Sequence, residues 1–151
     1  MLVPRPPRYQ PARAFPAYAY VPGRNARPAP HLAEHAESDY LWGVDLYNHG
    51  FYWEAHEAWE GLWRVAQRDP VQRAFLQGLI QCAAACLKSE LGDAAACRRL
   101  ATRGLARLQR VPADAAGRYM GLELADFITL FGACLAADPA QALRPPLLEL
   151  C

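Results

Sequence analysis

The sequence predicts an all-α fold, a single-domain bundle of about five helices with a Pro-rich extended arm at the N-terminus docked on it. Three observations support this prediction. Apolar residues recur at helical spacing through most of residues 31–136, and capping or helix-ending residues divide this region into short segments. The chain shows neither strand-like alternation nor a glycine-rich phosphate loop. Its 151 residues suffice for one well-packed core.

The first 30 residues form the predicted arm. They contain eight prolines, which exclude a helix or a central strand. Phe15, Tyr18 and Tyr20 nevertheless give this segment the apolar bulk to dock on a folded domain. We therefore expect two parts, an extended Pro/Arg-rich arm at 1–30 and a helical bundle domain at 31–151.

Five helices are expected in the bundle. Glycine or proline follows each of them, and Asp69 and Asp93 stand where the third and fourth helices need N-terminal caps. The third helix is apolar almost all round, so it should lie at the centre of the bundle. A short helical turn is expected at Asp138–Pro139. The predicted helices cover residues 31–49, 51–66, 70–91, 94–110 and 119–136.

The net charge of +1 hides an uneven distribution. The arm carries five arginines and no acid, which leaves −4 for residues 31–151. A basic arm of this kind can contact nucleic acid, but its charge is sparse and the body is acidic. We therefore expect the arm to wrap the acidic body of its own chain, and we expect partners other than nucleic acid. The five arginines of the predicted fourth helix are expected to form a solvated face.

The composition also bounds where the protein works. No apolar run approaches the roughly 20 residues of a membrane span, and the N-terminus lacks the apolar core of a signal peptide. The five cysteines include no C-x-x-C pair, which argues against a disulfide framework or a zinc ribbon. We therefore expect a cytoplasmic protein that makes no membrane contact.

Aromatic and ionisable residues are densest in residues 50–63, where three Trp, three Glu and one His occur. On a helical wheel, His56 and Glu60 lie four residues apart at the border of the apolar face, and Glu54 lies on the opposite, polar arc. A carboxylate at that spacing can orient the imidazole as a general base, or both groups can bind a divalent metal ion. The pair is therefore the candidate metal-binding centre of the protein.

Neighbouring residues complete the predicted pocket. Gln77 and Gln81 lie four apart on the next helix and would meet the pair if the two helices pack antiparallel. Glu57 is the candidate catalytic base, because His-Glu-x-x-Glu resembles the helical zinc-protease signature with its second histidine replaced. The same groups can instead form a buried network that fixes helix register without binding or catalysis. The predicted pocket consists of His56, Glu60, Gln77, Gln81, Trp53, Trp63 and Tyr52.

Other histidines have simpler interpretations. Asp45 and His49 are four apart at the end of the first helix and could join His56 in a metal site if the first two helices form a hairpin. A solvated pair at a helix terminus is the expectation, since histidine there also suits the helix dipole. His31 and His35 are expected on the surface.

Two motifs carry a resemblance to a known family. They are Asn48-x-Gly50-x-Tyr52-x-Glu54-Ala55-His56-Glu57-x-x-Glu60-x-x-Trp63-Arg64 and Phe75-Leu76-Gln77-Gly78-Leu79-Ile80-Gln81-x-Ala83-Ala84. From about residue 41 to residue 108 the chain resembles domain-of-unknown-function family 309 (DUF309). The resemblance implies an all-helical fold and no established activity. It also implies that the characteristic polar positions are His56, Glu57, Glu60, Gln77 and Gln81. The resemblance implies a Pro-His-Pro after Gly23, where this chain has Arg27-Pro28-Ala29-Pro30.

The residues support three hypotheses for function. The first is a cytoplasmic helical-bundle protein whose polar pocket binds a small ligand or a divalent metal ion. The second is a metal-dependent hydrolase with His56 and Glu60 as ligands and Glu57 as base. The third is a structural or protein-interaction module whose polar cluster is only a core network. The partner is a small molecule or a protein, and an exposed apolar face on the fifth helix would indicate a homodimer.

Overall fold

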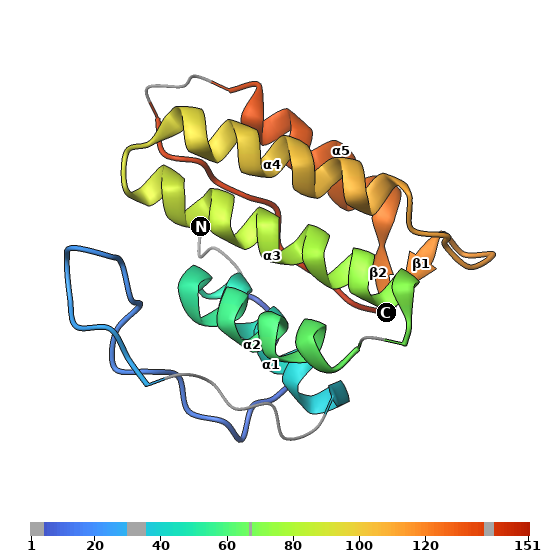
Figure 1. Cartoon of the computed structure of the whole chain (residues 1–151), viewed down its shortest axis with the longest axis horizontal. Helices are drawn as coiled ribbons and strands as arrows, with labels where there is room; N and C mark the ends of the chain where they lie inside the picture. Colours follow the sequence, from blue (N-terminus) through green and yellow to red (C-terminus); the bar gives the residue numbers. More distant parts are fainter. Residues whose placement is uncertain (1–4, 30–35, 67, 138–140) are drawn as a thin grey trace.

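The computed structural model describes residues 5–29, 36–66, 68–137 and 141–151. It confirms the all-α fold with the arm docked on it (Figure 1). A two-stranded antiparallel hairpin precedes the last helix. None of the helices in the described ranges is long and apolar enough to cross a bilayer. The elements are α1 (Ala36–Asn48), α2 (Tyr52–Val65), α3 (Pro70–Glu90), α4 (Ala94–Gln109), β1 (Arg118–Tyr119), β2 (Leu122–Glu123) and α5 (Leu124–Leu135).

Helix α3 lies at the centre of the bundle, as predicted. Helices α1 and α2 lie on one side of it, and α4 and α5 lie on the other (Figure 1). The C-terminal segment returns along the bundle and is held by Asn48, whose amide donates to the Leu148 carbonyl oxygen at 2.9 Å. The Leu148 N–H donates back to the Asn48 side chain at 2.7 Å. The end of the chain is therefore fixed to the end of α1.

The predicted caps of the two long helices are present. The Asp69 carboxylate accepts from the Gln72 N–H at 3.0 Å, and the Asp93 carboxylate accepts from the Ala96 N–H at 3.0 Å. Each bond satisfies one of the amides that a helix N-terminus leaves without an intrahelical partner. Local sequence therefore fixes where α3 and α4 begin.

The bundle is packed most closely where glycines let backbones approach. A Cβ at Gly78 would lie 3.1 Å from the Gly104 carbonyl oxygen, and a Cβ at Gly104 would lie 2.8 Å from the Gly78 carbonyl oxygen. The axes of α3 and α4 therefore come together at this glycine pair. The residues that flank it, among them Gln81 and Arg107, lie beside one another along the hairpin.

The arm docks on α1 through ionic and aromatic contacts, which confirms that it wraps its own acidic body. Arg8 and Arg13 pair with Asp45 and Asp39, each at 3.2 Å. Phe15 of the arm stacks on the Trp42 ring of α1 at 5.5 Å, and the Arg13 guanidinium lies 4.7 Å from the centre of the same ring. Because both carboxylates are buried in the finished fold, the arm is part of the core and not an appendage.

The fifth helix is shorter than predicted. It begins at Leu124 and not at residue 119, and β1 and β2 occupy the intervening residues. Met120 and Gly121 have φ values of 49° and 82° at the turn, a left-handed conformation that a helix cannot include. On the finished helix Leu130 is 55% exposed, while Phe131 is buried.

Some predictions fall on residues outside the described ranges. They are the start of the first helix near Pro30, the surface positions of His31 and His35, and the turn at Asp138–Pro139. The boundary between arm and bundle at residue 30 lies there too, and it stays a prediction.

Candidate functional site

Helix α2 is held in one rotation by its tryptophan anchor. The Trp59 side chain is fully buried, and its indole N–H donates to the Tyr40 carbonyl oxygen at 3.3 Å. Ala55 and Leu62 share this buried face. With the face fixed, the helical period places His56 and Glu60 at its border, half-buried, as the wheel predicts.

The structure brings His56, Glu57 and Glu60 together. The His56 Nε2 lies 3.2 Å from a Glu60 carboxylate oxygen, and its Nδ1 lies 3.6 Å from a Glu57 carboxylate oxygen. The three side chains are 24%, 16% and 30% exposed, respectively. One ligand atom from each lies within 4.8 Å of the other two. The imidazole therefore has a carboxylate on each of its two nitrogens.

Two buried side-chain nitrogens in and beside this cluster have no hydrogen-bond partner among the described residues. The His56 Nδ1 is buried without a partner among the described residues, because 3.6 Å to Glu57 is too long for one. The Trp63 indole nitrogen, one turn beyond Glu60, is buried and unpartnered in the same way. The Arg73 guanidinium stacks on the Trp63 ring at 4.5 Å. Unpartnered buried polar atoms are uncommon in folded proteins, so both need an explanation.

The remaining predicted pocket residues have other contacts. Tyr52 packs edge-on against Tyr47, and burial raises the pKa of its phenol. Trp53 packs edge-on against Tyr20 of the arm at 4.8 Å. The Gln81 carbonyl oxygen accepts from Arg107 on α4 at 3.1 Å.

Gln77, one turn before Gln81 on α3, is half-buried. Its side chain makes no hydrogen bond within the part of the chain that the structure describes. Because the Gln81 side chain accepts from Arg107 of α4, it does not join the His56 ring in the predicted core network. The compact cluster consists of His56, Glu57 and Glu60, all on α2.

Asp45 is not the solvated residue that the sequence suggests. It is fully buried and accepts from the Tyr9 and Gln10 backbone N–H groups at 2.7 Å each, besides pairing with Arg8. The His49 Nδ1–H donates to the Asp45 carbonyl oxygen at 2.9 Å, and the ring lies 4.6 Å from the Phe15 ring of the arm. Both residues therefore serve the docking of the arm and not a metal site with His56.

Glu54 is the second acid that is buried although the sequence predicts it to be exposed. The helical wheel assigns it to the polar arc, but the arm covers it and leaves it 8% exposed. One carboxylate oxygen accepts from the Tyr20 N–H at 3.0 Å, and the other is buried with no hydrogen-bond partner among the described residues. Burial raises the pKa of Glu54 and also that of Glu90, and the charge of Glu54 raises the pKa of Glu90 further. The Arg24 guanidinium of the arm acts in the opposite direction and lowers the pKa of Glu90.

The burial of Glu54 predicts a pH dependence of stability. Folded Glu54 binds its proton more tightly than unfolded Glu54, so the free energy of unfolding should fall as the pH rises from about 4.3 through the raised pKa. Glu54→Gln removes this titration. The unfolding free energy of wild type minus that of the variant, from urea curves at each pH, should therefore decrease with rising pH. A difference that stays flat or increases would contradict the burial of this carboxyl.

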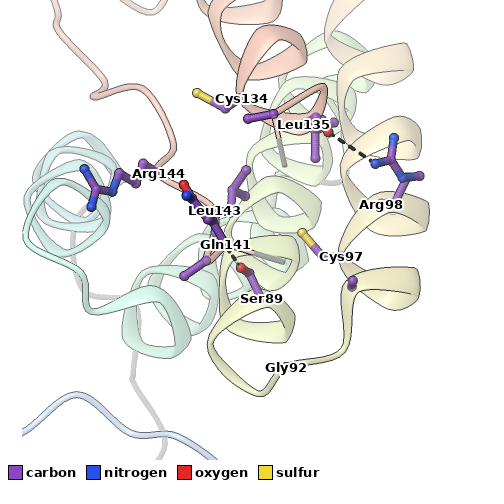
Figure 2. A pocket seen from close by; sticks show the side chains of 12 residues that line it. Ser89, Gly92, Cys97, Arg98, Cys134, Leu135, Gln141, Leu143 and Arg144 are labelled. Atoms are coloured by element: carbon purple, nitrogen blue, oxygen red, sulfur yellow. Dashed lines mark hydrogen bonds between the residues drawn. The ribbon is translucent and has the colours of Figure 1, made fainter. Parts of the chain in front are cut away.

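A cavity of about 330 Å³ lies elsewhere, where the end of α3 and the start of α4 meet the end of α5 and residues 141–144 (Figure 2). At its edge Arg98 donates to the Leu135 carbonyl oxygen at 3.2 Å, and the Ser89 hydroxyl accepts from the Leu143 N–H at 2.8 Å. Burial raises the pKa of the lining Cys97 thiol, which disfavours the thiolate that a metal requires. None of the predicted site residues lines this cavity.

Comparison with known proteins supports the resemblance drawn from the motifs. Residues 40–100 match the family model described as Domain of unknown function (DUF309). The matched range contains α2, all of α3 and therefore every residue of the predicted pocket. No curated protein matches the sequence.

Proposed function

We propose that the protein binds one divalent transition-metal ion of the zinc class through His56 and Glu60. Imidazole nitrogen and carboxylate oxygen are both zinc ligands, and imidazole also suits nickel and copper. The observation that carries the proposal is the 3.2 Å separation between the His56 Nε2 and the Glu60 oxygen. Two ligands at about 2.05 Å from one tetrahedral ion lie roughly 3.3 Å apart. The pair therefore has the spacing of a chelate with little rearrangement.

Glu57 acts in this proposal as the group that orients the ring. The two nitrogens of an imidazole point in different directions, so one ion at Nε2 leaves Nδ1 to its neighbour Glu57. A metal-bound histidine usually donates its other N–H to a carboxylate or carbonyl. The buried Nδ1 without a hydrogen bond would gain this partner if the Glu57 carboxylate closed from 3.6 Å to hydrogen-bonding distance.

This geometry favours binding over hydrolysis as the function of the site. A hydrolytic base must face the open coordination positions of the metal, where water and substrate bind. The Glu57 carboxylate instead lies on the Nδ1 side of the ring. The alternative of a purely structural network is also less well supported, because Gln81 bonds to Arg107.

We place this function in the cytoplasm. The five cysteines are all free, and Cys82, Cys86 and Cys97 are buried. Unpaired thiols of this number fit a reducing compartment better than an oxidising one. Retention of all five thiols in protein isolated under thiol-blocking conditions would support this location, whereas a native disulfide would oppose it.

Metal binding is tested on full-length protein purified without chelator or affinity tag. Elemental analysis and calorimetric titration with Zn²⁺ should give one equivalent. At zinc 100-fold above its Kd the free energy of unfolding should rise by about 2.7 kcal/mol. His56→Ala and Glu60→Gln should abolish both effects, while Glu57→Gln should weaken binding by about 10- to 100-fold.

Glu37→Gln is the matched control, because it removes an exposed carboxylate from α1, away from the site. It should bind zinc as wild type does. Absence of a stoichiometric metal together with an unchanged melting temperature in Zn²⁺, Ni²⁺, Co²⁺ and Mn²⁺ would exclude the proposal.

A further inference from the structure

Helices α3 and α4 contain no acid along their facing lengths. Residues 70–89 and 94–110 together hold seven cationic residues and not one aspartate or glutamate. The acids of this hairpin lie at the ends of its helices: Asp69 and Asp93 are N-caps, and Glu90 is the last residue of α3. The cationic residues are Arg73, Lys88, Arg98, Arg99, Arg103, Arg107 and Arg110.

Six of these residues lie on one face of the hairpin, which we call the basic face. On α4, Arg99, Arg103, Arg107 and Arg110 fall within about 80° of arc, since successive residues turn by 100°. Arg73 and Lys88 fall within a similar arc on α3, together with Gln77 and Gln81. The bond from Arg107 to Gln81 shows that the two arcs lie on the same side. Arg98 points elsewhere, to the Leu135 carbonyl oxygen.

The basic face has no neutralising partner within the described residues. Arg107 donates to an amide oxygen, and Arg73 stacks on Trp63. By contrast, Arg8, Arg13 and Arg64 each pair with a carboxylate. Like charges four residues apart on a helix repel, so this arginine stripe costs the isolated protein some stability. A polyanionic partner would remove that cost.

Charge is also strongly segregated over the chain. Residues 31–151 carry a net −4, and residues 94–110 alone carry +5, so the rest of that region carries −9. Such a separation orients a polyanion toward the positive helix and away from the remainder of the surface.

We propose that the basic face binds the phosphate backbone of a double-stranded nucleic acid without reading its base sequence. The stripe from Arg99 to Arg110 is about 16 Å long and spans roughly five phosphates of one strand. Protein–nucleic acid interfaces are polar and strongly positive, as this face is. This proposal does not depend on metal binding at α2.

The side chains beside the stripe select among polyanions. Binding in a lipid surface requires apolar side chains at the interface, and the large exposed apolar residues of the described chain are Tyr18, Val65, Leu91, Leu130 and Leu147, none within α3 or α4. An acidic protein would need an apolar anchor, which is missing for the same reason. Single strands bind by stacking on free aromatic rings, whereas Trp63 at the edge of the face is covered by Arg73.

The sequence alone favours partners other than nucleic acid, because the charge of the basic arm is sparse and the body is acidic. In the fold, Arg8 and Arg13 of that arm are neutralised by Asp45 and Asp39. The positive surface arises instead from two helices, and their alignment depends on the packing of Gly78 against Gly104.

The test is fluorescence anisotropy of the full chain with a labelled duplex of about 20 base pairs, over about 50 to 200 mM salt. Four phosphate contacts predict a slope of log K against log salt near −3.6, which is a roughly 100-fold loss of affinity over this range. Arg103→Gln with Arg107→Gln should reduce the slope to about −1.8 and weaken binding at the lowest salt.

Arg64→Gln with Arg144→Gln is the matched control, because it removes the same charge from exposed positions off the face. It should leave the slope unchanged. DNA and RNA duplexes, a single strand and vesicles rich in phosphatidylserine are compared in parallel. Equal loss in both double variants, tighter binding of the single strand or of vesicles, or a slope near zero would overturn the proposal.

Discussion

Replacing Asp45 by alanine should lower the free energy of unfolding by about 3–5 kcal/mol, the range for breaking a buried ion pair from one side. The carboxylate is fully buried and accepts from the Tyr9 and Gln10 N–H groups while pairing with Arg8. Alanine leaves two amides and a guanidinium without their acceptor. The four tryptophans, of which Trp42 and Trp53 contact the arm, make urea unfolding by fluorescence a suitable measurement.

Glu149→Ala provides the comparison, because it removes an exposed carboxylate near the C-terminus. It should change the free energy of unfolding by less than about 0.5 kcal/mol. If Asp45→Ala were equally mild, the arm would contribute little to the stability of the folded chain. Rapid proteolysis of the arm in an otherwise stable Asp45→Ala variant would show that the arm detaches alone, and the loss would then be smaller than predicted.

The fold was predictable where local chemistry decides it. Asp69 and Asp93 cap the helices they precede, and the period of apolar residues rotates α2 so that Trp59 is buried. The hairpin before α5 was not predictable in this way. Met120 has a positive φ, which is uncommon for methionine, and the apolar residues on either side suit a helix as well as a strand.

The part of the candidate site that lies on one helix was predictable for the same local reason, but the contribution of the neighbouring helix was not. His56, Glu57 and Glu60 belong to one helix, so their proximity follows from its period. Whether Gln81 joins them depends on the rotation of α3 against two neighbours, and the Gly78–Gly104 contact turns Gln81 toward Arg107. Single-helix geometry can be derived from sequence, but the choice between two neighbouring helices is a property of tertiary packing.

Burial of acids is the feature that sequence reasoning missed most clearly. The sequence predicts a solvated Asp45 at a helix terminus, and the helical wheel puts Glu54 on the polar side of its helix, yet both are buried. The arm covers both, supplying backbone N–H groups of Tyr9, Gln10 and Tyr20 as donors. The signal that could have indicated this is the match between an arm with five arginines and an acidic body.

Gly43→Ala should lower the free energy of unfolding by about 3 kcal/mol, although the same change in an open helix usually stabilises. A Cβ at Gly43 would lie 2.2 Å from the Trp59 indole nitrogen and 2.6 Å from a neighbouring ring carbon. Because Trp59 is fully buried, the ring cannot move without displacing the core or losing its bond to the Tyr40 carbonyl. Overpacking of this kind costs about 1–3 kcal/mol and sometimes more.

Gly132→Ala supplies the opposite sign in the same experiment. A Cβ there would meet nothing within 4 Å, so alanine should raise the free energy of unfolding by about 0.5–1 kcal/mol through its helix propensity. Both changes add one methyl group to a helical glycine, so a systematic error in the free energy of unfolding affects both variants equally. Opposite shifts in the urea midpoint would establish that α1 and α2 meet through the Gly43–Trp59 contact. If Gly43→Ala also stabilised the protein, the Trp59 ring would not lie against Gly43. Residues other than Trp59 would then fix the rotation of α2 that positions His56 and Glu60.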